Sequence, residues 1–99
     1  MEKDTFKTDV IFRVDKFGVY AIFPHNVDTL DGRVTIYAHV GQHTSGDYKS
    51  CIAQSRLATE AEAKDLKNEL ENSVGYDLNV IKKQNYNKYL KSYHEARKL

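Results

Sequence analysis

The sequence predicts a single α+β domain over residues 1–99, with a small antiparallel or mixed sheet of about four strands and two main helices packed on one face. Two observations predict it. Apolar and polar residues alternate in short segments of the first half, which is typical of strands. In the second half, apolar residues recur every three or four positions, which is typical of helices with one buried side. The length fits one domain and leaves little room for another.

The first half of the chain predicts three strands. Residues 9–14 alternate β-branched and aromatic side chains, residues 16–18 (Lys-Phe-Gly) supply a turn, and residues 19–23 form the returning strand of a hairpin. Pro24 is expected to end that strand, because proline cannot donate a hydrogen bond to a sheet. Residues 34–40 alternate most regularly and predict the clearest strand.

The second half predicts helices and one more strand. Residues 41–47 are expected to be a loop and residues 48–54 a short helix, and residues 78–81 predict a short strand. Thr59 and Glu62 have the spacing of a capping box, so a helix should begin there and end near Gly75.

A final helix is expected to begin at Asn85, a residue type that caps helices well. Its aromatic and apolar side chains recur at helical spacing and predict a buried stripe made of Tyr86, Tyr89, Leu90 and Tyr93.

Composition limits the compartment and the kinds of site. Cys51 is the one cysteine, so neither an intramolecular disulfide nor a four-cysteine zinc site can form, and a reducing cytosol is the simplest expectation. The first residues show no signal-peptide pattern, and no segment is apolar for the roughly 20 residues that a membrane helix needs. The sequence therefore predicts a cytoplasmic location and no membrane contact.

Charge is distributed unevenly along the chain. Residues 1–79 hold nine lysines and arginines against thirteen aspartates and glutamates, a net charge of −4, whereas residues 80–99 hold six against one, a net charge of +5. Such a basic segment is suited to nucleic acid or another acidic partner, with tyrosines available for stacking on bases. The alternative is an ordinary solvated helix face. The candidate partner-binding residues are Lys82, Lys83, Lys88, Lys91, Arg97 and Lys98.

The segment 37–43 (Tyr-Ala-His-Val-Gly-Gln-His) brings two histidines together around a glycine. One interpretation is a ligand-binding loop at a strand end, where donors and acceptors would line a pocket. The candidate ligand-binding residues are Tyr37, His39, Gln42, His43 and Asp47. The competing interpretation is structural: His39 packs beside Tyr37, and His43 hydrogen-bonds within its loop.

Evidence for catalysis is weak. A metal-dependent hydrolase using His39, His43 and Asp47 is one alternative, with His25 as a further ligand, although the helical spacing of zinc proteases is missing. Cys51 with a histidine would be a nucleophilic pair, but a lone buried cysteine is the commoner reading. We therefore expect no catalytic residues, no metal site and no cofactor.

The chain resembles a family of small uncharacterised proteins from bacteriophages and from bacteria that carry mobile elements. The resemblance covers residues 23–81 and is carried by Phe23-Pro24, the histidine segment 37–43, Asp47-Tyr48, Ala58-Thr59, residues 66–71 and residues 75–81. The chain departs from the family at Leu57, where a proline is expected. The resemblance carries over no activity. It implies an accessory protein acting inside a bacterial cell.

Three functional hypotheses follow from these observations. The favoured one is a small non-enzymatic accessory protein that engages a host macromolecule or nucleic acid. The second is a protein that binds or sequesters a nucleotide-like small molecule through residues 37–47. Because so small a core leaves little cavity, a second subunit would complete that pocket, and a homodimer is then expected. The third is the metal-dependent hydrolase.

Overall fold

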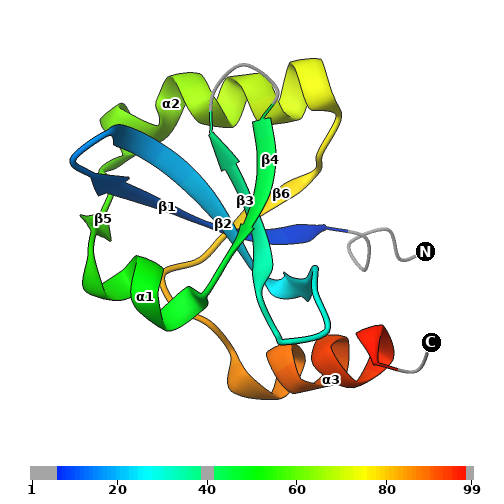
Figure 1. Cartoon of the computed structure of the whole chain (residues 1–99). Coiled ribbons are helices and arrows are strands. Elements are labelled where there is room, and N and C mark those ends of the chain that lie inside the picture. Colours follow the sequence, from blue (N-terminus) through cyan, green and yellow to red (C-terminus); the bar gives the residue numbers. More distant parts are fainter. Residues whose placement is uncertain (1–6, 39–41, 98–99) are drawn as a thin grey trace.

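The computed structural model describes residues 7–38 and 42–97, with Gln42 described through its backbone alone (Figure 1). The fold is α+β and its sheet is mixed, but the described residues form six strands, more than the four expected. They are β1 (Thr8–Asp15), β2 (Gly18–Val27), β3 (Val34–Ala38), β4 (Gln42–Gly46), β5 (Arg56–Leu57) and β6 (Leu78–Val80).

The strand order is β4-β3-β2-β1-β5, with antiparallel neighbours throughout. The last strand, β6, pairs in parallel with the first part of β1, so β5 and β6 cover different stretches of the same strand. The short strand expected at residues 78–81 is thereby confirmed as β6. Residues 56–57 were not predicted as a strand, and residues 42–46, expected within a loop, instead pair with β3 as β4.

The residues that the structure describes form three α-helices beside the sheet: α1 (Tyr48–Ala53), α2 (Glu60–Asn68) and α3 (Tyr86–Ala96). The last turns after α2 form a π-helical segment, Glu69–Val74. The expected caps are confirmed, since Thr59 and Glu62 form the capping box and Asn85 accepts the Lys88 N–H. Gly75 ends the second helix in a left-handed conformation with φ of 100°.

The prediction that the main helices share one face of the sheet is wrong. Figure 1 shows α2 along the top of the view and α3 along the bottom, with the sheet between them. On the α2 face of the sheet, the strands bury a cluster with α2 and the segment after it, made of Val10, Phe12, Ala21, Phe23, Tyr37, Ala63, Leu66, Leu70 and Leu78. On the opposite, α3 face, a second cluster packs against α1 and α3, made of Ile11, Ile22, Val27, Val34 and Ile36.

Helices cover both faces of the sheet, and this explains why the central strands contain consecutive apolar residues. Val10, Ile11 and Phe12 are consecutive and all buried, because alternate side chains of β1 enter opposite clusters. The alternation in the sequence indicated the side chains of one face, such as Val10 and Phe12, but not Ile11 on the other face. The alternation predicted for residues 34–40 is seen in β3, where Tyr37 enters one cluster while Val34 and Ile36 enter the other.

Pro24 does not end β2, as was expected, but lies inside it. Phe23 pairs with Thr35 and Val27 with Val34, so the intervening residues of β2 form an enlarged bulge. A bulge tolerates proline because the ladder hydrogen bonds are already interrupted there. It also turns His25 out of the ordinary strand register.

The turn before β3 contains a glycine that cannot be replaced freely. Gly32 has φ of +91°, and a Cβ added to it would lie 2.5 Å from the Tyr89 hydroxyl of α3. That hydroxyl donates to the Gly32 carbonyl at 3.0 Å. Gly18 in the β1–β2 turn also has positive φ, +121°, but a Cβ there would meet nothing within 4 Å.

We therefore expect Gly32→Ala to destabilise the fold more than Gly18→Ala does. Both changes carry a backbone cost of about 1–3 kcal/mol, but only the first also displaces Tyr89. Chemical denaturation of the two variants measures the difference. In a Tyr89→Phe background, the difference in unfolding free energy between Gly32→Ala and Gly18→Ala should become smaller. An unchanged difference would show that the contact with the Tyr89 hydroxyl does not cause it.

Candidate functional site

The described residues of the histidine segment make contacts within the fold. Tyr37 is only 1% exposed, and its hydroxyl hydrogen-bonds the Glu69 carboxylate from beneath α2. His43 lies opposite Tyr37 in the β3–β4 ladder, packs edge-on against that ring with centroids 4.7 Å apart, and places Nε2 3.2 Å from the Tyr76 hydroxyl. His39 and the side chain of Gln42 lie outside the described residues. The described part of the segment is therefore mainly structural.

Asp47, the fifth candidate, belongs to the other side of the sheet. It caps α1 by accepting the backbone N–H of Ser50 at 3.0 Å and the Ser50 hydroxyl at 2.8 Å. These two hydrogen bonds lower the pKa of the Asp47 carboxyl. His43, by contrast, packs on the α2 face with Tyr37 and Tyr76.

The hydrolase alternative gains no support from this placement. Residues 7–38 and 42–97 contain no group of three or more His, Cys, Asp or Glu side chains that could hold a metal ion. Cys51 packs with the α3-face cluster, away from His43, and burial raises the pKa of its thiol. Neither a metal centre nor a Cys–His pair is therefore assembled from the described residues.

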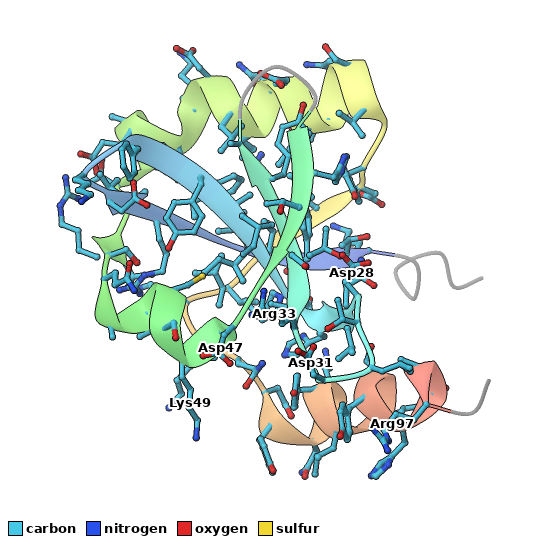
Figure 2. All side chains as sticks on the ribbon, in the orientation of Figure 1. Asp28, Asp31, Arg33, Asp47, Lys49 and Arg97 are labelled. Carbon is cyan, nitrogen blue, oxygen red and sulfur yellow. The ribbon has the colours of Figure 1, made fainter. Side chains whose placement is uncertain are left out.

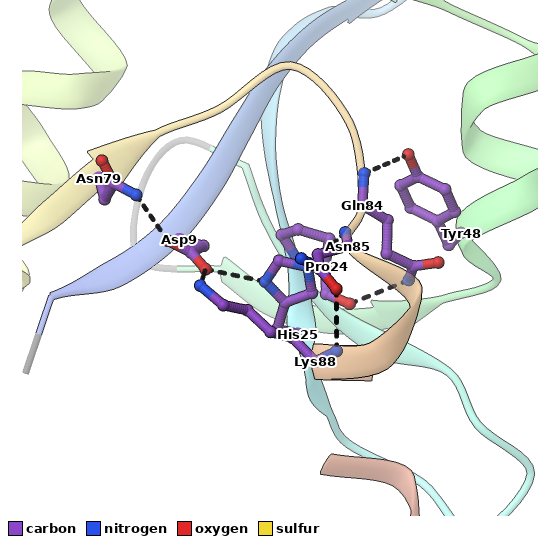
Figure 3. A network of polar contacts seen from close by, with 8 residues as sticks. All are labelled: Asp9, Pro24, His25, Tyr48, Asn79, Gln84, Asn85 and Lys88. Atoms are coloured by element: carbon purple, nitrogen blue, oxygen red, sulfur yellow. Dashed lines mark hydrogen bonds and ion pairs between the residues drawn. The ribbon is translucent and has the colours of Figure 1, made fainter. Parts of the chain in front are cut away.

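A network of polar contacts does surround His25, which sequence analysis named only as a spare metal ligand (Figure 3). Its Nε2 accepts the Asn85 backbone N–H at 2.7 Å, so Nδ1 carries the proton and donates to Asp9 at 2.9 Å. Asp9 also accepts from Asn79 at 2.8 Å and from Lys88 at 3.2 Å. We call these five residues the His25 clasp.

The His25 clasp contains the histidine and carboxylate of a catalytic dyad, but the histidine has no free ring nitrogen. A pocket of about 380 Å³ lies beside it, lined by Lys7, Thr8, Asp9, His25, Asn26 and Tyr76. Both nitrogens of His25, however, are already engaged by protein groups, so neither remains to accept a substrate proton. The arrangement instead ties β1, the β2 bulge and the start of α3 together.

Further hydrogen bonds reinforce the attachment of α3. The Gln84 side chain donates to the Pro24 carbonyl at 3.0 Å, and its backbone N–H donates to the Tyr48 hydroxyl at 3.0 Å (Figure 3). Ser92 accepts the Val27 N–H at 2.9 Å. No residue of α3 is fully buried, so polar contacts carry much of its docking.

Five of the six basic partner-binding candidates lie within the described residues. Lys82, Lys83, Lys88, Lys91 and Arg97 are all exposed, while Lys98 lies outside the described residues. Two of the five make polar contacts with other described residues: Lys88 with Asp9, and Arg97 with the Leu30 carbonyl at 3.0 Å. Arg97 follows the last residue of α3, at the C-terminal end of the helix (Figure 2).

A stack of tyrosines runs along the same helix. The ring centroids of Tyr86 and Tyr89 are 6.0 Å apart and those of Tyr89 and Tyr93 are 6.1 Å apart, with the Arg97 guanidinium 5.4 Å from the Tyr93 centroid. Tyr89 and Tyr93 also pack on the α3-face cluster, as predicted. Tyr86 does not, and it is 63% exposed.

Comparisons with known proteins add no assignment: no family model, no curated protein and no solved structure matches this chain. Within the described part of the chain, no helix is long and apolar enough to cross a membrane.

The Asp9 carboxylate should make stability depend on pH. Burial favours a higher pKa, but the hydrogen bonds from Asn79, His25 and Lys88 outweigh it, so the pKa of Asp9 lies below its usual value. A depressed pKa stabilises the fold above the ordinary value of about 3.9, and this stability is lost as pH falls through the folded value.

We therefore expect Asp9→Asn to cost about 1–3 kcal/mol near neutral pH and progressively less in acid. Urea unfolding of both proteins across the acidic range measures the difference. Asp65→Asn, on the exposed side of α2, is the matched control and should show no such pH-dependent loss. If the loss of stability caused by Asp9→Asn did not change with pH, the ionised Asp9 carboxylate would not be its cause.

Proposed function

We propose that this protein is a non-enzymatic accessory binding protein and that its C-terminal basic segment binds nucleic acid, single strands in particular. One observation carries the proposal: exposed lysines lie before and after an exposed tyrosine in the sequence, and that tyrosine begins a stack of aromatic rings. The setting, a bacteriophage or mobile element acting in the bacterial cytoplasm, rests on the sequence resemblance alone.

Electrostatics supports a polyanionic partner. Residues 80–99 carry a net charge of +5 while the rest of the chain is net negative, so attraction is concentrated at one end. Lys82, Lys83 and Lys91 are exposed, and no salt bridge within the described residues involves them. Such side chains can neutralise phosphates without first breaking an ion pair.

The tyrosine stack supports bases as the second element of recognition. Within the described residues, the only ring on which Tyr86 stacks is Tyr89. A base placed against Tyr86 would extend a series that continues through Tyr89 to Tyr93 and Arg97. Unpaired bases offer such a face whatever their sequence, which favours single strands and little sequence preference.

The phosphate contacts predict a strong salt dependence. Binding of a fluorescent oligothymidylate of about 16 nucleotides can be followed by anisotropy. The logarithm of Kd should rise linearly with the logarithm of the salt concentration. Lys82→Ala with Lys83→Ala should reduce the slope by about 1.4, because each lost contact to a single strand contributes about 0.7.

Lys49→Ala with Lys64→Ala removes the same charge from α1 and α2 and serves as the control. That variant should keep the original slope. Salt-independent binding, or an equal effect of both double variants, would contradict a localised nucleic-acid site. Absence of any oligonucleotide binding would leave a host protein as the macromolecular partner.

Stacking predicts a different signature at Tyr86. Tyr86→Ala should cost about 1–3 kcal/mol in binding and leave the salt slope unchanged, because it removes a ring and no charge. Tyr86→Phe keeps the ring and should bind nearly as well as the original protein. The same anisotropy assay measures both, and equal binding by the alanine variant would remove stacking from the mechanism.

A further inference from the structure

We infer that the pocket between α1 and the β1–β2 hairpin is a binding site for a small organic cation, an amine or amidine carried on a flat or apolar body. This site is separate from the basic surface and would accept a ligand of opposite charge. The pocket measures about 360 Å³ and opens on the α3 face of the sheet.

Small side chains create the floor of the pocket. Gly18, Ala38 and Gly46 all line it, from β2, β3 and β4 respectively. Gly46 also lets α1 approach the sheet, since an added Cβ would lie 3.4 Å from Cys51 Sγ and 3.2 Å from Ile36 Cγ1. The hollow is therefore part of how the helix and sheet pack, with Thr44 among its polar lining groups.

An exposed aromatic ring contributes to the lining. Phe17 lines the pocket from the hairpin tip and is 86% exposed, which is unusual for so large an apolar side chain. The Lys16 ammonium lies 5.3 Å from the centroid of this ring. The ring can thus receive a cation, and a ligand cation can use the same interaction.

The charged groups of the lining have one sign. Asp15 lines the pocket at the end of β1 and Asp47 lines it at the start of α1, and no basic residue is among the described residues that line it. Arg13, the buried cation of this region, is committed elsewhere, because it donates to the Ser55 hydroxyl and carbonyl at 2.7 Å each. The two carboxylates therefore favour a cation over an anion, and a ligand cation would take the place of the Lys16 ammonium on the Phe17 ring.

The remaining polar groups favour reversible binding. Thr44, Ser50 and Gln54 supply hydroxyl and amide groups suited to hydrogen bonds with an N–H donor. Cys51 also lines the pocket, but burial raises the pKa of its thiol and disfavours the nucleophilic thiolate. The chemistry of the site is recognition of a cation, with no covalent step.

Three probes of the same shape and different charge test the inference: benzamidine, benzamide and benzoate. Titrated into the ¹⁵N-labelled protein, benzamidine should produce saturable amide shifts at Gly18, Thr44 and Gly46, with weaker effects from benzamide and none from benzoate. Equal shifts with benzoate, shifts confined to other residues, or no saturable shift with benzamidine would overturn it.

Charge-removing variants keep the fold intact. Asp15 accepts the Phe17 N–H at 2.8 Å and Asp47 caps α1, and asparagine can serve both functions. Asp15→Asn with Asp47→Asn should weaken benzamidine about tenfold. Asp65→Asn with Asp77→Asn, both exposed and away from the pocket, should leave it unchanged. Equal weakening by both pairs would overturn the site.

A second arm distinguishes the source of the cation. Agmatine carries the guanidinium on a free small molecule, and an acetylated Gly-Arg-Gly amide carries it as a protein side chain. Tighter binding of agmatine supports a metabolite, and tighter binding of the peptide supports an arginine of a partner protein. Ala38→Leu, which fills the pocket, should abolish both, and retained binding would overturn the inference.

Discussion

The attachment of α3 depends on the bulge in β2. By interrupting the strand register, Pro24 and its neighbours bring His25 against the Asn85 N–H and the Asp9 carboxylate. The helix has no fully buried side chain, so apolar packing alone would hold it weakly. These hydrogen bonds position the tyrosine stack and the lysines on the surface, and they complete the cover over the second face of the sheet.

Local signals in the sequence predicted much of the secondary structure. The capping pair Thr59 and Glu62, the cap Asn85 and the turn at Gly18 each act within a few residues, so their effect is legible without the fold. Polar β4 and the two-residue β5 escaped prediction because only their pairing with β3 and β1 makes them strands.

Among the candidate sites too, some features follow from the local sequence and others depend on the fold. The exposed lysines of the C-terminal segment were predictable, since charge and helical spacing are read directly from sequence. The packing of the ligand-binding candidates was not, because the pairing of β3 with β4 places His43 opposite Tyr37, which is buried on the α2 face. The pocket beside Phe17 had no sequence signal, since its lining comes from five separate elements and the turn between β1 and β2.

The double use of β1 has a consequence for the order of folding. Its outer edge receives β5 at one end and β6 at the other, and the Lys88 side chain of α3 reaches its Asp9. β1 is synthesised early, whereas β5 and β6, which pair with it, leave the ribosome much later. Contacts so distant along the chain slow folding, and until they form the outer edge of β1 has unpaired backbone hydrogen-bonding groups.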